Sequence, residues 1–160
     1  SILIAVLAQI SIHVPFSPIP ITGQTIGVIL VGGLLGRNRG VLAVAAYLFE
    51  GASGLPVFAE FKAGAQVLIG PTAGYLWAFI PAAYLTGLAV EKGFTANPVM
   101  SFITCFASTT LILILGAGFL SIITESFSEA LSIGFYPFLV GDVVKSSLCA
   151  VLLSSARKIN

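Results

Sequence analysis

Two residues of opposite charge, Asp142 and Lys145, stand inside an apolar run that extends from Gly134 to Ser155. The run is long enough to cross a bilayer as one helix, in which residues three apart share a face. At about 1.5 Å per residue, both charges would lie near the middle of the membrane. An ionisable side chain at that depth costs roughly 2.5 to 3.5 kcal/mol on insertion scales and usually marks a ligand or ion pathway. We therefore predict a polar site here; the alternative is a structural ion pair between helices.

The composition identifies the class of protein that must position this site. Of the 160 residues, 58% are hydrophobic and only 8% are charged, and the mean hydropathy is +1.09. Soluble chains are about a quarter charged, so we predict an integral membrane protein. A net charge of +1 gives no sign of nucleic-acid binding. Cys105 and Cys149 lie in apolar runs, which indicates packing residues and not a disulfide or a metal pair.

We expect an all-α protein with six transmembrane helices in a single domain, residues 1–160. The first helix has about a dozen apolar residues where a span needs about twenty, so we expect it to be clipped at its start. The prolines of 15–20 predict a rigid extended loop, and 52–69 is typical of a loop or re-entrant segment. The expected helices lie at about 1–12, 22–36, 40–51, 71–91, 98–124 and 133–155.

Basic residues are unequally distributed between the connections of these helices. One set of alternate connections carries Arg37, Arg39, Lys92, Arg157 and Lys158, and the other carries Lys62 with Glu60, Glu125 and Glu129. Because Lys and Arg in short loops favour the cytoplasmic side, we predict that both termini are cytoplasmic. The site on the last helix would then open outward.

Hydrolytic enzymes fit the sequence poorly. Gly51-Ala52-Ser53-Gly54 matches the Gly-x-Ser-Gly pattern of rhomboid intramembrane proteases, but the only histidine, His13, precedes it in the first loop. An aspartyl protease needs two aspartates and a zinc protease two histidines, and the chain has one of each. We therefore predict no catalytic residue, no metal and no cofactor. An intramembrane serine protease and a channel or structural membrane protein are kept as alternatives.

Several blocks of sequence, in order, resemble the BioY family, the biotin-binding S-components of energy-coupling-factor (ECF) transporters. The blocks are 8–12, 15–25, 54–59, 70–76 and Gly141-Asp142-x-x-Lys145, and the resemblance covers nearly the whole chain. It implies an S-component-like bundle in the cytoplasmic membrane that captures biotin from outside and passes it inward. It also implies two kinds of partner, a transmembrane coupling subunit and a pair of cytoplasmic ATPases. The chain has no Gly-x-x-x-x-Gly-Lys-Ser/Thr loop, so ATP would be hydrolysed by those partners.

With biotin as the implied ligand, Asp142 and Lys145 become its expected polar anchors. Asp142 would accept the ureido N–H groups, and Lys145 would donate either to the ureido carbonyl or to the valerate carboxylate. The loop 15–24 is expected to act as a lid, with Thr22 and Gln24 near the polar ring.

A second wall of the site is expected from the segment 52–75. Phe58 and Tyr75 would cover the apolar ring and chain of biotin. Glu60 and Lys62 fit either this wall or a solvated loop, and Glu50 is a further candidate partner for Lys145.

Overall fold

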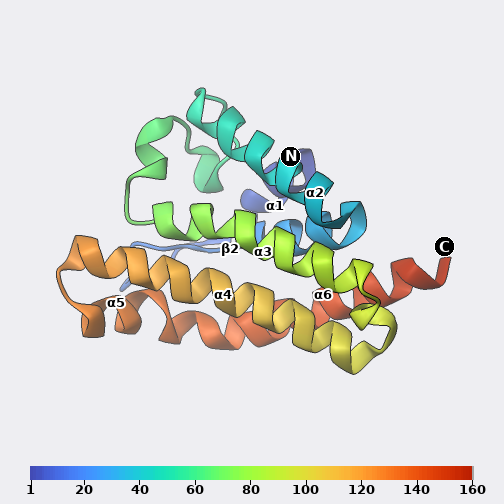
Figure 1. Ribbon diagram of the computed structural model, residues 1–160. Helices are drawn as coiled ribbons and strands as arrows, with labels where there is room; N and C mark the ends of the chain where they lie inside the picture. Colours follow the sequence, from blue (N-terminus) through green and yellow to red (C-terminus); the bar gives the residue numbers. More distant parts are fainter. Residues whose placement is uncertain (160) are drawn as a thin grey trace.

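The computed structural model describes residues 1–159, with side chains described for 1–156, and it is almost entirely helical (Figure 1). The elements in order are α1 (Ile2–Ala8), β1 (Ser11–Ile12), β2 (Ile21–Thr22), α2 (Gln24–Ala52), η1 (Ala59–Phe61), η2 (Ala65–Leu68), α3 (Ala73–Glu91), η3 (Phe94–Ala96), α4 (Pro98–Thr124), α5 (Phe127–Gly134), η4 (Tyr136–Phe138) and α6 (Leu139–Ile159). The predicted all-α class is confirmed. Arg157 and Lys158, which contribute to the predicted orientation, lie outside the described side chains.

Four helices are long and apolar enough to cross a membrane: Gln24–Ala52, Ala73–Glu91, Pro98–Thr124 and the combined segment Phe127–Ala156. The predicted count of six transmembrane helices is therefore not supported within the described residues. With seven residues, α1 is about 10 Å long, whereas the hydrocarbon core of a bilayer is about 30 Å thick. The helices expected at 22–36 and 40–51 are the two halves of α2, which a kink at Gly36 separates.

The break expected after residue 36 is a glycine turn inside α2. Gly36 has φ +79° and ψ 170°, a conformation that residues with a Cβ rarely adopt. A Cβ on Gly40 would lie 2.7 Å from the Cα of Gly32, so the two halves of α2 turn back on each other. Glu91 of α3 secures the turn, because its carboxylate accepts the Arg37 backbone N–H at 2.9 Å and pairs with Arg37 Nε at 3.2 Å.

The long helices pack through small and hydroxyl side chains. α3 lies between α2 and α4, and α6 packs against α4 and α2 (Figure 1). Thr86 of α3 donates to Ser108 of α4 at 2.8 Å, and the hydroxyls of Thr109 and Ser146 join α4 to α6 at 3.0 Å. Lipid tails are as apolar as leucine, so close packing and interhelical hydrogen bonds must supply much of the cohesion of such a bundle.

The proline loop folds across one end of the bundle. β1 and β2 pair antiparallel, with Ser11 opposite Thr22 and Ile12 opposite Ile21, so the segment between them is the loop of a hairpin. Ser17 Oγ donates to the carbonyl of Ile133, at the end of α5, at 2.6 Å. This contact holds the loop against the connection that leads into α6.

Candidate ligand-binding site

A cavity lies between the long helices beneath this loop. It comprises about 790 Å³ of space between atoms, including the open space at its mouth. Small-molecule sites typically combine apolar walls with a few polar groups, as this cavity does. Seven of the nine predicted site residues line it: Thr22, Gln24, Phe58, Lys62, Tyr75, Asp142 and Lys145.

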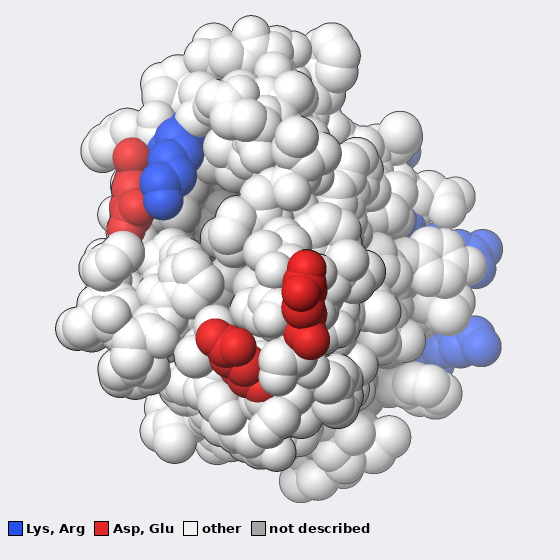
Figure 2. Space-filling model, turned by 90° about the vertical axis from the view of Figure 1, so that its left-hand side faces the viewer, with Lys and Arg blue, Asp and Glu red and all other residues white. Residues whose placement is uncertain are grey.

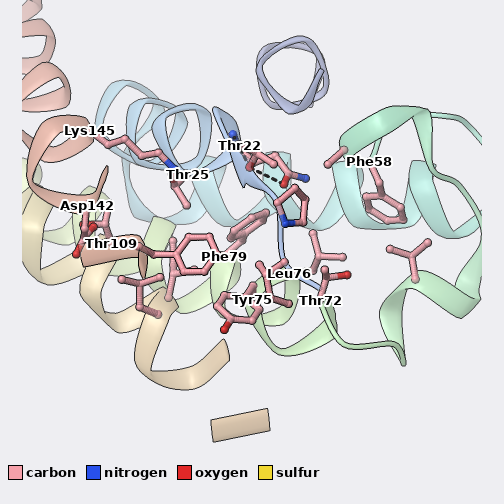
Figure 3. Close-up of a pocket in the computed structure, with 18 of the residues that line it drawn as sticks. Thr22, Thr25, Phe58, Thr72, Tyr75, Leu76, Phe79, Thr109, Asp142 and Lys145 are labelled. Atoms are coloured by element: carbon pink, nitrogen blue, oxygen red, sulfur yellow. Dashed lines mark hydrogen bonds between the residues drawn. The ribbon is translucent and has the colours of Figure 1, made fainter. Parts of the chain in front are cut away.

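Asp142 and Lys145 reach the cavity from one turn of α6 (Figure 3). Asp142 is 4% exposed, and its Oδ2 accepts a hydrogen bond from Thr110 of α4 at 2.8 Å. Lys145 is half-buried. Within the described part of the chain, no ion pair of 4.0 Å or less joins the two. The geometry thus favours two separate groups that face a ligand over a closed structural pair.

A second polar edge of the cavity comes from Thr22 at the end of β2 and Gln24 at the start of α2. Thr22 Oγ1 donates to Gln24 Oε1 at 2.9 Å, and Gln24 Nε2 donates to the hydroxyl of Tyr47 at 2.6 Å. Tyr47 in turn donates to the carbonyl of Val57 at 3.1 Å. Tyr47 was not predicted as part of the site, because a tyrosine in an apolar helix gives no signal beyond packing.

Phe58 and Tyr75 form part of the aromatic wall. The ring of Phe58 meets Tyr47 edge to face, with centroids 5.5 Å apart, and lies over Gly51, where a side chain would collide with it. The hydroxyl of Tyr75 donates to the carbonyl of Gly134 at 2.6 Å, and its ring packs on Gly116. Glycines at these positions leave room for the two rings.

The loop charges are divided between the cavity and its surroundings. Glu60 does not line the cavity; its carboxylate lies 2.8 Å from Lys62 Nζ and 3.3 Å from His13 Nδ1. These contacts hold the pKa of Glu60 below its usual range. Figure 2 looks onto the end of the molecule that carries these loops and α5, and it shows few charged side chains on a mostly uncharged surface. Glu50 does not line the cavity either. Its carboxylate accepts a hydrogen bond from Ser1 Oγ at 2.8 Å and, among the described side chains, forms no ion pair with Lys145.

The expected lid is only partly a cavity wall. Ile19, Pro20 and Thr22 line the cavity, whereas Phe16 is exposed and does not. The Ser17 contact to Ile133 keeps this part of the loop close to the mouth.

Several lining residues were not predicted from the sequence. Phe79 lies one turn after Tyr75 on the same face of α3, and that spacing was the available signal. The others carry no charge or motif that separates them from packing residues; they include Thr25, Thr72, Thr109, Ile112 and Phe138.

The residues of a serine protease are not brought together. Ser53 Oγ donates to the carbonyl of Phe49 at 2.8 Å, and the partner of His13 is Glu60. A nucleophile and its base need to be within hydrogen-bond reach. The structure therefore gives no support to the Gly-x-Ser-Gly alternative.

The fold and the cavity define a helical membrane protein with a small-molecule site between its helices and its loops. A model of the BioY family matches residues 1–160. The chain is 41% identical to the biotin transporter BioY of Thermotoga maritima, over 98% of this chain and 90% of that protein. It is 35% identical to the probable biotin transporter BioY of Pyrococcus horikoshii, over 94% of this chain and 86% of that protein.

A solved structure agrees with these relatives. The crystal structure of the S-component for biotin from an ECF-type ABC transporter superposes with a TM-score of 0.88 and 29% identity, over 97% of this chain and 85% of that chain. The chain belongs to the BioY family, and the resemblance seen in the sequence blocks is confirmed.

Proposed function

We propose that this chain is the biotin-binding subunit of an ECF-type transporter, which captures biotin outside the cytoplasmic membrane and passes it inward. The observation that carries the proposal is the pair Asp142 and Lys145, facing a largely apolar cavity without closing on each other. Membership of the BioY family supplies the identity of the ligand, since the relatives named above are a biotin transporter and a probable biotin transporter.

The chemistry of the cavity suits biotin. Its thiophane ring and valerate chain are apolar, and aromatic walls such as Phe58 and Tyr75 stabilise such groups by roughly 25 cal/mol per Å² removed from water. Its ureido group has two N–H donors and one carbonyl acceptor. Asp142 accepts such donors in charge-assisted bonds, and Lys145 donates to the carbonyl or to the carboxylate.

Partner subunits complete the proposed transporter. An S-component has no motor of its own, and this sequence has no phosphate-binding glycine loop of the Walker type. We therefore assign ATP hydrolysis to a pair of cytoplasmic ATPases, joined to this chain by a transmembrane coupling subunit.

Binding of labelled biotin to the purified chain in detergent or nanodiscs tests the proposal. We expect saturable binding that unlabelled biotin displaces and that thiamine and riboflavin do not. Failure of biotin to bind a folded preparation, or equal displacement by the other vitamins, would overturn it.

The proposed orientation has both termini in the cytoplasm, as the distribution of basic residues favours. We expect an introduced Asn38→Cys to react with a membrane-impermeant maleimide only from the cytoplasmic face, in inverted vesicles. Ser128→Cys on α5, at the opposite end, is the matched control and should react in intact cells. Both positions are exposed, and the native Cys105 and Cys149 are buried. Labelling of Asn38→Cys in intact cells would contradict this orientation.

A further inference from the structure

We propose that Tyr47 is a positioning residue for the site: it fixes which hydrogen-bonding groups Thr22 and Gln24 present to the ligand. This inference rests on the proposed function, because it concerns how the same cavity recognises the polar ring of biotin. Tyr47 itself does not line the cavity and is 0% exposed, so it acts only through the residues that it touches.

The hydroxyl of Tyr47 lies between two partners that belong to different segments. On one side is Gln24 Nε2, at 2.6 Å, from the start of α2. On the other is the carbonyl oxygen of Val57, at 3.1 Å, in the loop that follows α2. One buried oxygen therefore joins the two segments that contribute Gln24 and Phe58 to the cavity.

The direction of these hydrogen bonds is determined by the backbone. The carbonyl of Val57 can only accept, so the single hydroxyl proton of Tyr47 goes to it. The Tyr47 oxygen must then accept from Gln24, and this requires the amide nitrogen of Gln24 to point toward Tyr47. The amide oxygen of Gln24 consequently points toward Thr22 and accepts the Thr22 hydroxyl proton at 2.9 Å.

Two groups are left for a ligand after these bonds are made. An amide nitrogen carries two hydrogens, and Gln24 uses one of them on Tyr47, so one donor remains. The hydroxyl of Thr22 has spent its proton on Gln24 and can offer only a lone pair, so it is an acceptor. Both residues line the cavity, where Figure 3 shows Thr22 with its hydrogen bond drawn.

One donor beside one acceptor complements a ureido edge, which presents a carbonyl beside an N–H. It does not complement a group that has donors only. If Tyr47 lost its hydroxyl, the amide of Gln24 could rotate by half a turn and present its oxygen instead. The nitrogen of Gln24 would then donate to Thr22, and the freed Thr22 proton would face the ligand, so the donor and the acceptor would exchange places. A ureido edge matches only the natural order, whereas a group with donors only matches one position in either order, so the preference for a ureido group would fall.

The first test is a double-mutant cycle between Tyr47→Phe and Gln24→Ala, read as the dissociation constant for biotin. Tyr47→Phe keeps the ring against Phe58 and removes one oxygen, and we expect it to weaken binding about ten-fold, the effect of one buried hydrogen bond. In the Gln24→Ala background the same change should have less than about a two-fold effect. Tyr84→Phe, on an exposed face of α3, is the matched control and should bind as the natural protein does. An unchanged affinity in Tyr47→Phe, or the same loss in both backgrounds, overturns the inference.

The second test is a ratio of affinities that a merely structural role would not alter. In 2-iminobiotin a protonated cyclic guanidine replaces the ureido group and offers donors only. We expect the preference for biotin over 2-iminobiotin to fall at least five-fold in Tyr47→Phe. General loosening of the fold would weaken both ligands equally and leave the ratio of affinities unchanged. An unchanged ratio would therefore contradict the inference. The ratio does not depend on the folded fraction of a preparation.

Gln24→Glu provides a second variant if Tyr47→Phe yields no folded protein. Its carboxylate offers only acceptors to the ligand, so the same ratio should fall with Tyr47 intact. A ratio equal to that of the natural protein would count against the inference. If the natural protein itself does not bind biotin, the proposed function fails, whereas failure of these variants alone affects only Tyr47.

Discussion

The double variant Asp142→Asn with Lys145→Met is expected to fold and to lose biotin affinity by roughly 10² to 10⁴-fold. Hydrogen bonds to charged groups contribute about 1.5 to 3 kcal/mol each, and two are removed from the ligand. Both side chains line the cavity, and the structure records no ion pair between them within its described part. The loss should therefore appear in binding more than in folding.

The double change is preferable to either single change as a test. A single change leaves one charge in the apolar cavity without its opposite, so a single variant can fail to fold for reasons unrelated to the ligand. Asp142→Asn keeps the shape of the side chain and its contact with Thr110. Binding of labelled biotin and thermal unfolding in detergent should be measured on the same preparations.

A matched control lies on the same helix. Val144 is exposed on α6, between the two charged residues in sequence but outside the cavity lining, and Val144→Ala should bind biotin normally. If Asp142 and Lys145 formed only a structural pair, the folded double variant would keep near-normal affinity. That result would remove both residues from the site.

Tyr75→Ala is expected to weaken biotin binding by about 10 to 100-fold and also to destabilise the protein. The ring of Tyr75 forms part of the cavity wall and fills the space left by Gly116, and its hydroxyl binds the Gly134 carbonyl before α6. Truncation of a buried aromatic residue to alanine typically costs about 3 to 5 kcal/mol of stability. The measurements are the dissociation constant for biotin and the melting temperature.

Tyr75→Phe separates the two roles of this residue. It keeps the apolar wall and removes only the bond to Gly134, so we expect nearly normal affinity with a lower melting temperature. Equal biotin affinity in Tyr75→Ala and the natural protein would exclude Tyr75 from the wall.

Much of the fold and site could be predicted because charges are rare in this chain. Only 8% of the residues are charged, so each intramembrane charge is conspicuous, and Asp142 and Lys145 were found from type and spacing alone. The helices at 71–91 and 98–124 were predicted nearly to their observed ends, because prolines and charged residues mark them. The family blocks added Thr22, Gln24, Phe58 and Tyr75 as expected site residues, all of which line the cavity.

Contacts between distant segments decided what the sequence left open near the mouth of the cavity. Glu60 and Lys62 are two residues apart, but only Lys62 lines the cavity, because Glu60 is occupied by Lys62 and by His13 from a distant loop. Likewise, the basic turn after Gly36 was expected to separate two helices. That break is present as the kink at Gly36, and only the structure shows that the two halves of α2 fold back on each other through the close approach of Gly32 and Gly40.

By itself, then, the sequence determined the class of protein, the family and the two charged residues of the proposed site, because a charge in an apolar run is costly wherever the helix lies. Only the tertiary structure decided which apolar and hydroxyl residues face the cavity, such as Phe79 and Phe138, and which one orients Gln24. The physical reason is that lipid, helix interface and cavity wall are all apolar environments. No change of polarity along a membrane helix distinguishes them, and only the packing of one helix against another does.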